Sequence, residues 1–409
     1  MDIAPKKERA RVLVLTSTYP RWQGDTVPAF VHELARRLTD EFEIHVLAPH
    51  TAGAHEEESL DGVSVHRFHY LPVRFETLAY GSGILPGLRS HPWRAAALFS
   101  FLIAEYAAAA KLLRTRDFSL IHAHWLVPHG IIATRFRKRN LALLCTSHGS
   151  DLFALNAALF TSFKRTALNH ADAITVVSGA LRRKAETLIG ETDRIHVMPM
   201  GVDTARFCPP PAGTYRSGLL YVGRLVHEKG LHTLLSAMHD NARRGSNPHL
   251  TVIGSGPAES KYKRQAEKLG LESQVRFLGA LPNHELVPFY QTAEALIFPS
   301  LLGSSGQQEG MGLVPIEALA CECPVIASSL PAVCETISDR ETGLLFTPDD
   351  ISGLAACIAH VLDDPDRARQ SARRGRELVT KRYGWDVAAA AYRGLYLKLI
   401  DSRRSTTLD

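Results

Sequence analysis

The sequence predicts an α/β protein of two domains, each built on a parallel sheet with helices on both faces. Short β-branched runs alternate with longer segments in which apolar residues recur every three or four positions. The alternation stops at a stretch rich in proline and glycine, residues 200–216, and then restarts. The 409 residues also exceed the usual extent of one hydrophobic core, so two domains of roughly 200 residues each are expected.

The first half of the chain contains strand candidates that are apolar along most of their length, as in strands buried on both faces. They are Arg11–Ser17, Glu43–Pro49, Val63–Phe68, Ser119–His124, Leu141–Ser147 and Ala173–Ser178. Helical segments such as Val27–Leu38 lie between most of them. The most apolar helix, Ala95–Leu113, contains Glu105 and Lys111. We therefore interpret it as a packed helix rather than a membrane span.

The second half repeats this pattern. Its strand candidates are Gly218–Arg224, Leu250–Gly256, Gln274–Gly279, Ala295–Ser300, Pro324–Ser328 and Thr342–Phe346. A capped surface helix is predicted after Asp363, and an amphipathic helix over Trp385–Ile400. We place the domains at residues 1–200 and 201–383. Because ligands of such sheets bind beyond the carboxyl ends of the strands, a cleft between the domains is expected to hold the site.

Charge and cysteine usage limit the function classes. Lys and Arg number 47 against 42 Asp and Glu, and the net charge of +5 comes from the first 200 residues, with basic clusters at Arg135–Asn140 and Arg182–Lys184. These clusters are either solvated helix faces or a surface for an anionic membrane or acidic acceptor. The six cysteines form no CxxC pair, and the charged N-terminus is unlike a signal peptide. A cytoplasmic protein without a nucleic-acid partner is expected.

The segment GRLVHEKG, Gly223–Gly230, follows a strand candidate and precedes a helix. Arg224 and Lys229 bracket its turn. Two cations beside a helix N-terminus suit a phosphate or pyrophosphate. The competing interpretation is that both side chains are simply solvated.

Two weaker signals follow the next strands. GSGP, which begins at Gly254, combines a glycine turn with a helix start, although turn geometry alone explains its residues equally well. Farther along, main-chain groups near Phe277 and Leu278 end a strand and are candidates to hydrogen-bond a planar base. Ordinary strand packing competes with that interpretation.

The stretch EGMGLVPIE places carboxylates at Glu309 and Glu317, on either side of an apolar run. Gly310 and Gly312 would let the backbone approach a ligand, and a helix starting near Gly312 would direct free N–H groups toward an anion. Carboxylates accept hydrogen bonds from vicinal hydroxyls. The pattern therefore suits a nucleotide sugar, which has hydroxyls at both ends and phosphates between. Alternatively, Glu309 caps the helix and Glu317 pairs with a nearby base.

The ordered set GRLVHEKG, GSGP, EGMGLVPIEALACECPVIAS and ETGLLF resembles the retaining glycosyltransferases of family 4. These have the GT-B fold, two Rossmann-like domains facing across a cleft. YPRWQGDTVPAFVHELARRL, IHAHWLVPHG, TSHGSD and YGWDVAAAAY extend the resemblance over nearly the whole chain. It implies that a last helix, residues 384–409, crosses back onto the first domain. The chain departs from the family in SSLPAVCE, where Leu330 and Pro331 replace the usual small residues.

In the second domain, the resemblance implies that Arg224 and Lys229 bind the donor diphosphate and the leaving nucleotide. Glu309 would hold sugar hydroxyls near the reacting carbon, and Glu317 the ribose. The main chain between them would contact sugar and phosphate through Gly310, Met311, Gly312 and Leu313. Gly254, Phe277 and Leu278 complete the predicted donor site.

In the first domain, the resemblance implies that His148 faces the donor sugar, although a structural role competes. Gly24 matches a loop glycine that approaches the phosphates. Asp151 is expected to hold His148 or to touch the acceptor. His122 and His124 lie on one side of a strand, and one of them is expected to be structural; His124 and Asp151 are the candidate acceptor contacts.

The implied reaction is transfer of a hexosyl group from a UDP- or GDP-sugar to an acceptor hydroxyl, with retention at the anomeric carbon. No DxD motif follows a strand, so no metal and no cofactor are expected; the nucleotide sugar is a substrate. Arg224, Lys229 and the helix N-terminus near Gly312 would stabilise the leaving group. Same-face attack by the acceptor is favoured over a protein nucleophile.

The acceptor prediction depends on Phe68–Trp93, a long aromatic and glycine-rich segment, and on the basic first half. Together they suggest a lipid-linked saccharide at the inner face of the cell membrane, as in surface polysaccharide biosynthesis, with the enzyme peripheral on that face. A non-catalytic sugar-nucleotide-binding protein is the main alternative. A dehydrogenase is disfavoured because no GxGxxG follows the first strand.

Overall fold

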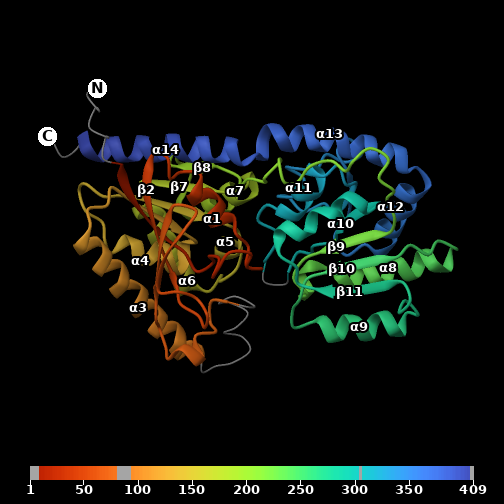
Figure 1. Ribbon diagram of the computed structural model, residues 1–409, viewed down its shortest axis with the longest axis horizontal. Helices are drawn as coiled ribbons and strands as arrows, with labels where there is room; N and C mark the ends of the chain where they lie inside the picture. Colours follow the sequence, from red (N-terminus) through yellow and green to blue (C-terminus); the bar gives the residue numbers. More distant parts are fainter. Residues whose placement is uncertain (1–8, 81–93, 304–305, 406–409) are drawn as a thin grey trace. The chain divides into compact units, whose positions relative to one another are not determined.

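The structure, a computed structural model, describes residues 9–80, 94–303 and 306–405. It contains two compact α/β units, which Figure 1 colours along the chain. Unit 1 comprises Met1–Val176, Arg182–Met198 and Ala388–Asp409, and unit 2 comprises Val177–Leu181 and Pro199–Val387. Each unit is built on a largely parallel sheet, so the predicted fold class is confirmed.

Unit 1 contains an eight-stranded sheet in the order β3-β4-β2-β1-β5-β6-β7-β8. Its strands are β1 Ala10–Leu15, β2 Phe42–Pro49, β3 Glu57–Leu60, β4 Val63–Phe68, β5 Leu120–His124, β6 Ala142–Ser147, β7 Ala173–Val176 and β8 Ile195–Val197. All neighbours pair in parallel except β3 with β4. In the centre of the sheet, Val12 lies opposite both Ile44 and Leu120. All three are at most 1% exposed, which accounts for the apolar runs.

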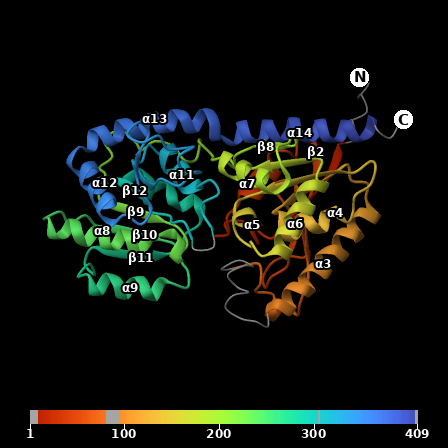
Figure 2. The ribbon, with the colours of Figure 1, turned by 180° about the vertical axis from the view of Figure 1, so that it is seen from behind.

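The helices of unit 1 lie against the faces of this sheet. They are α1 Phe30–Arg36, η1 Val73–Phe75, α3 Arg94–Thr115, η2 Leu126–Gly130, α4 Ile131–Thr134, α5 Ser150–Phe153, α6 Ala158–His170 and α7 Gly179–Ile189, with α14 Trp385–Ser405 at the end of the chain. Figure 2 shows α4 and α6 from behind, where they pack against each other. Within α14, Ala388 and the residues after it group with unit 1.

Helix α3 packs against β2, β4 and α4. Its inward stripe consists of buried Ala97, Phe101, Glu105 and Ala109, at the four-residue spacing of one helix face. Among the described residues, Ala96–Thr115 is long and apolar enough to cross a membrane by length and composition alone. Because the Glu105 carboxylate is buried and contacts a side chain of the same unit, one face of the helix is part of the protein interior.

Unit 2 contains a six-stranded parallel sheet in the order β11-β10-β9-β12-β13-β14. Its strands are β9 Leu219–Val222, β10 Leu250–Ile253, β11 Val275–Gly279, β12 Ala295–Phe298, β13 Val325–Ser328 and β14 Leu344–Phe346. Its helices are η3 His227–Lys229, α8 Leu231–Arg243, α9 Glu259–Lys268, η4 Asn283–Leu286, α10 Val287–Thr292, α11 Leu313–Ala320, α12 Ile351–Asp363 and α13 Pro365–Tyr383. The capped helix predicted after Asp363 is present, since Asp364 caps α13, and Asp350 caps α12 in the same way; each carboxylate accepts a backbone N–H hydrogen bond.

Every strand expected from the sequence is present, and β3 and β8 are additional. β3 is a polar edge strand, EESL, whose residues alternate between exposed and half-buried, so it lacks the apolar signal of the buried strands. β8 has three residues, too few for a periodic pattern. The departure at SSLPAVCE is accommodated in unit 2, since Leu330 there is 3% exposed and joins the buried core.

Candidate functional site

The strand order of unit 2 reverses between β9 and β12, which are neighbours in the sheet although β10 and β11 separate them in the chain. At such a switch point, the loops after the two strands diverge and leave a crevice at the carboxyl edge. Arg224 and Lys229 follow β9, and Glu309 follows β12. The topology therefore brings together residues that the sequence separates by 80 positions.

Lys229 and Glu309 form an ion pair at this edge, with 2.5 Å between Nζ and Oε2. Both side chains are half-buried. The Lys229 ammonium also lies 5.2 Å from the ring centroid of Phe298, the last residue of β12, where a cation–π contact supplements the ion pair. Arg224 is on the exposed part of the same turn, and its carbonyl accepts a hydrogen bond from the Tyr221 hydroxyl at 3.3 Å.

Two glycines allow the loops at this edge to approach closely. Gly230 has a φ of +69°, and a Cβ there would lie 1.8 Å from the carbonyl oxygen of Pro299. Gly254 has a φ of +139°, and its Cβ would lie 1.9 Å from the carbonyl oxygen of Gly223. Neither position can hold a side chain without backbone movement. GSGP thus has a structural role in seating one loop on the other, and its predicted donor contact stays a prediction.

The predicted helix start is present: α11 begins at Leu313, directly after Gly312, which has a φ of +81°. In the part of the chain that the structure describes, no side chain caps this first turn. Gly310, Met311 and Gly312 are buried. Because the first N–H groups of a helix have no partners within the helix, this loop presents main-chain donors beside Glu309.

Glu317, on α11, is held by two side chains that the sequence analysis did not identify. Asn283 Nδ2 donates to Oε1 at 2.8 Å, and the Tyr290 hydroxyl donates to Oε2 at 2.9 Å. Burial raises the pKa of Glu317 to about 7, against the effect of both hydrogen bonds, which favour the carboxylate. Both partners lie in the segment NHELVPFY after the β11 strand, but no recognisable motif in that segment indicates a contact with Glu317.

Phe277 and Leu278 lie in β11, the edge strand of the unit 2 sheet, and both are half-buried. The Lys263 ammonium lies 5.5 Å from the Phe277 ring centroid. At the end of this strand, the carbonyl oxygen of Gly279 accepts a hydrogen bond from Gly254 N at 2.8 Å. The strand end is thereby tied to the glycine loop, while contact with a nucleobase stays a prediction.

In unit 1, the predicted histidines, buried His124 and half-buried His148, form a pair at the ends of β5 and β6. His124 Nδ1 and His148 Nε2 are 2.9 Å apart, so one ring donates a proton to the other. Phe30 and Trp125 pack around the His148 ring, with centroids at 4.8 and 4.9 Å. Burial lowers the pKa of His148 to about 3 and the pKa of His124 well below its usual value. Both rings are therefore neutral at physiological pH and act as hydrogen-bonding groups rather than cations.

His122 is the structural histidine of the HAHW segment, as the sequence analysis expected of one of the two. Its ring nitrogens lie 2.6 Å from the hydroxyl oxygens of Tyr396 and Thr146, and it is fully buried. Asp151 is also buried, and its carboxylate accepts hydrogen bonds from Leu126 N at 2.7 Å and from the Ser147 hydroxyl at 2.7 Å. Asp151 therefore holds the backbone around His148, and a contact with an acceptor stays a prediction.

Gly24 lies in the exposed loop between β1 and α1. Its φ is +77°, but a Cβ there would meet no atom within 4 Å. An ion pair between Arg21 and Asp25 closes the loop around it, with 2.5 Å between Nη2 and Oδ1. Gly24 thus serves turn geometry within unit 1, and its predicted approach to the donor phosphates stays a prediction.

Comparison with known proteins places this architecture in a family of enzymes. Residues 27–206 match the family described as Glycosyltransferase Family 4, and residues 215–378 match Glycosyl transferases group 1. The glycogen synthase of Mycobacterium tuberculosis is 31% identical over 290 residues, which cover 68% of each chain. This protein therefore belongs to the family 4 type of glycosyltransferases, and its GT-B fold is shared with solved members.

A second curated relative agrees with this assignment, and solved structures share the fold. A GDP-mannose-dependent alpha-(1-6)-phosphatidylinositol monomannoside mannosyltransferase of M. tuberculosis is 30% identical over 292 residues, covering 68% of this chain and 76% of that protein. Sucrose-phosphate synthase from Thermosynechococcus elongatus superposes with a TM-score of 0.77 at 22% identity, covering 96% of this chain and 100% of that one. HepE from Anabaena, solved in complex with UDP, gives a TM-score of 0.68 at 16% identity, covering 95% and 100%.

Proposed function

We propose that this glycosyltransferase moves a hexosyl group from a nucleoside diphosphate sugar to an acceptor hydroxyl with retention of anomeric configuration. The observation that supports it best is the ion pair of Lys229 and Glu309 at the switch point of unit 2. It places a cation for phosphate next to an acid for sugar hydroxyls. The first turn of α11, which no side chain of the described residues caps, adds main-chain donors beside them. Such preorganised charge stabilises a departing nucleotide without a metal at the donor phosphates.

The role of Glu309 follows from its pairing. A carboxylate positioned by an ammonium at 2.5 Å is directed to accept hydrogen bonds from sugar hydroxyls once a donor diphosphate has engaged the ammonium. We therefore favour attack by the acceptor on the same face of the sugar as the leaving group. In this scheme His148, neutral at physiological pH because burial lowers its pKa to about 3, contributes a hydrogen bond to the sugar rather than charge.

The donor base is either uracil or guanine in this proposal. Relatives named as GDP-mannose-dependent enzymes support a guanosine donor, and fold neighbours solved with UDP support a uridine donor. On either donor, Glu317 would accept hydrogen bonds from the ribose hydroxyls. Asn283 and Tyr290 position its carboxylate for that contact.

The proposed acceptor is a lipid-linked saccharide at the cytoplasmic face of the membrane. The outer face of α3 supports it, since Phe99 and Ile103 are 68% and 55% exposed. The Tyr106 ring stacks on Phe136 with centroids 4.9 Å apart, which brings the basic segment Arg135–Asn140 beside this apolar face. Apolar and basic side chains together suit an anionic lipid surface. Residues 81–93 of the predicted acceptor segment lie outside the described residues.

The test is thermal unfolding with UDP-, GDP-, ADP- and TDP-sugars in turn, with EDTA in every sample. A donor at 100 times its dissociation constant would stabilise the protein by about 2.7 kcal/mol, a shift of several degrees. A shift with one base that is absent in Lys229→Met supports the donor site. No shift with any donor contradicts it.

Turnover then separates the enzyme from a sugar-nucleotide-binding protein of the same fold. With the donor identified, the protein is incubated with lipid-linked saccharides, and the product anomer is assigned by NMR. A product with the donor's anomeric configuration supports retention. Donor binding without transfer to any saccharide acceptor would favour the non-catalytic alternative, and an inverted product would contradict the mechanism.

A further inference from the structure

Two histidines and a glutamate converge at one edge of unit 1, and two of them, His69 and Glu76, belong to the segment Phe68–Trp93 of the acceptor prediction. His50 directly follows β2, His69 directly follows β4, and Glu76 follows η1. Because β2 and β4 are adjacent parallel strands, the residues after their carboxyl ends meet at the same edge. The segment between β4 and Glu76 folds back and places the carboxylate against both rings.

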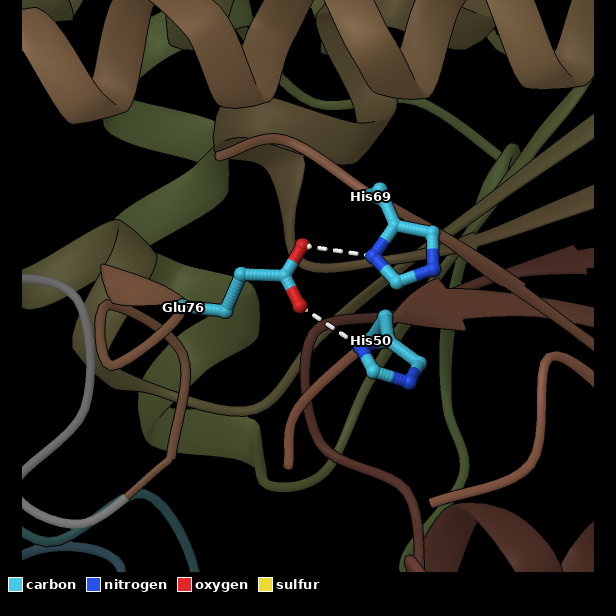
Figure 3. A group of neighbouring side chains, drawn as sticks. All are labelled: His50, His69 and Glu76. Atoms are coloured by element: carbon cyan, nitrogen blue, oxygen red, sulfur yellow. Dashed lines mark hydrogen bonds and ion pairs between the residues drawn. The ribbon is translucent and has the colours of Figure 1, made fainter. Parts of the chain in front are cut away.

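Figure 3 shows both imidazole rings turned toward this carboxylate. His50 Nδ1 lies 2.5 Å from Oε2 of Glu76, and His69 Nδ1 lies 3.1 Å from Oε1. The ring centroids are 4.0 Å apart. Glu76 is 1% exposed and His50 is 6% exposed, so water contributes little to the solvation of these groups.

The outward nitrogens define the tautomers of both rings. His50 Nε2 lies 3.1 Å from the carbonyl oxygen of Ala54, which can only accept a hydrogen bond, so Nε2 carries a proton. His69 Nε2 lies 3.2 Å from Oε1 of Glu56, an acceptor when ionised, so it is protonated in the same way. Neutral rings in these tautomers direct the lone pairs of both Nδ1 atoms at the oxygens of Glu76.

A cation between the two Nδ1 atoms and the carboxylate oxygens would contact all three groups at once. Histidines anchored through the outer nitrogen by a carbonyl and a carboxylate are also the usual arrangement around protein-bound metals.

We propose that His50 Nδ1, His69 Nδ1 and the Glu76 carboxylate bind one divalent cation of the Zn²⁺ class. Two imidazoles and a carboxylate favour zinc or a similar transition metal over Mg²⁺ and Ca²⁺, which prefer oxygen ligands. The ligand atoms lie within 4.8 Å of one another. Tetrahedral coordination needs them about 3.3 Å apart, so no pair of ligand atoms has to move by more than about 1.5 Å.

The metal would fasten the connection after β4 to the ends of β2 and β4. With three protein ligands, the fourth position is open to water. The spacing of His50, His69 and Glu76 matches no metal-binding motif. The sequence analysis, which expected no metal because no DxD motif follows a strand, did not identify these residues. This site lies wholly within unit 1, and its proposal does not depend on the donor assignment in unit 2.

The experiment is a Co²⁺ titration of the full chain after removal of metals with a chelator, followed by displacement with Zn²⁺. The visible absorption of Co²⁺ reports a low-coordinate site, and equilibrium dialysis gives the number of ions bound. One equivalent is expected. His69→Gln should weaken binding by about 100-fold or more, and Glu56→Gln by about 10-fold. His170→Gln, which changes an exposed histidine of the same unit, should bind as the unaltered protein does.

His69 is the informative position because its side chain is 38% exposed, so its replacement leaves the core intact. Thermal unfolding gives an independent readout: Zn²⁺ should raise the melting temperature of the unaltered protein and of His170→Gln but not of His69→Gln. Absence of the Co²⁺ band, or equal binding by His69→Gln and His170→Gln, would overturn the proposal.

Discussion

Lys229 and Glu309 reach each other from loops after two different strands, and their ion pair, 2.5 Å from Nζ to Oε2, closes the switch point of the unit 2 sheet. In the absence of a donor, each group neutralises the other. A donor diphosphate would take over the ammonium, and the carboxylate would then be available to sugar hydroxyls. The pair thus holds both groups in position before binding, which lowers the cost of organising them during the reaction.

Removing either partner tests this relationship. Lys229→Met and Glu309→Ala are each expected to lower kcat/KM for transfer by about 10²–10³-fold, the usual effect of losing one preorganised electrostatic contact. Steady-state kinetics give the value, and circular dichroism checks the fold. Lys268→Met, which changes an exposed lysine of α9, is the matched control. Near-normal turnover in both variants would refute the assignment.

The close approach at Gly230 predicts a stability effect. Gly230→Ala would place Cβ 1.8 Å from the Pro299 carbonyl oxygen, whereas Gly245→Ala, at a similar φ of +88°, would meet no atom within 4 Å. The control Gly245→Ala should therefore lose only about 1 kcal/mol of unfolding free energy, from the backbone conformation, and Gly230→Ala should lose about 1–3 kcal/mol more. Thermal unfolding should show a melting temperature lower by several degrees in Gly230→Ala. Equal losses would contradict the packing argument.

The raised pKa of Glu317 predicts a pH-dependent stability. Its pKa rises from 4.5 to about 7 on burial, so the folded protein binds this proton more tightly than the unfolded chain. The stabilisation is present below pH 4.5 and is lost as the pH rises to about 7. Glu317→Gln stays neutral at every pH. Its free energy of unfolding in urea, relative to that of the unaltered protein, should therefore increase as the pH rises from 5 to 8. A constant difference across that range would show that the carboxyl titrates normally.

The neutral histidines predict the opposite pH dependence for unit 1. The pKa of His148 falls from 6.5 to about 3 on burial, so the unfolded chain binds its proton more tightly. The contribution of His148 to stability is present above pH 6.5 and is lost as the pH falls toward 3. Urea unfolding gives the free energy of unfolding at pH 7.5 and at pH 5. The decrease between these two pH values should be smaller for His148→Gln than for the exposed-site control His170→Gln. Equal losses would mean that His148 protonates without cost.

The exposed face of α3 predicts membrane association. The double variant Phe99→Ser and Ile103→Ser should lose most of its co-sedimentation with vesicles containing anionic lipid, while remaining folded, because both side chains point outward. Tyr215→Ser is the control, since Tyr215 is 83% exposed on unit 2. If the double variant and the control sediment alike, the α3 surface is not a lipid contact.

The fold was predictable from the sequence because its strands are nearly all buried. The run that became β9 is apolar at every position and the one that became β1 at every position but Arg11, and prolines and glycines mark the break between the two series. Helix starts at Leu313 and Pro365 were also predictable, since glycine and acidic caps are local signals. Edge strand β3 was not, because half of its residues face solvent.

The partners of the candidate site residues were not predictable. Sheet order brings distant loops together, and this produces the contacts of Tyr290 with Glu317 and of Lys229 with Glu309. No local sequence pattern indicates that these residues are close in space. The same holds for His50 and Glu76. Motifs indicated which residues carry chemistry, but pairing, burial and the resulting pKa shifts depend on the tertiary structure.

The glycines that seat the unit 2 loops on one another also restrict how donor preference can change. Because Gly230 and Gly254 leave no room for even a methyl group against neighbouring carbonyls, protein engineering that seeks a different sugar or base has no productive substitutions there. Variation must instead use side chains on the loop surface, such as Gln307 and Gln308, which are half-buried beside Glu309. A library directed at those two positions would sample specificity while the loop backbone stays fixed.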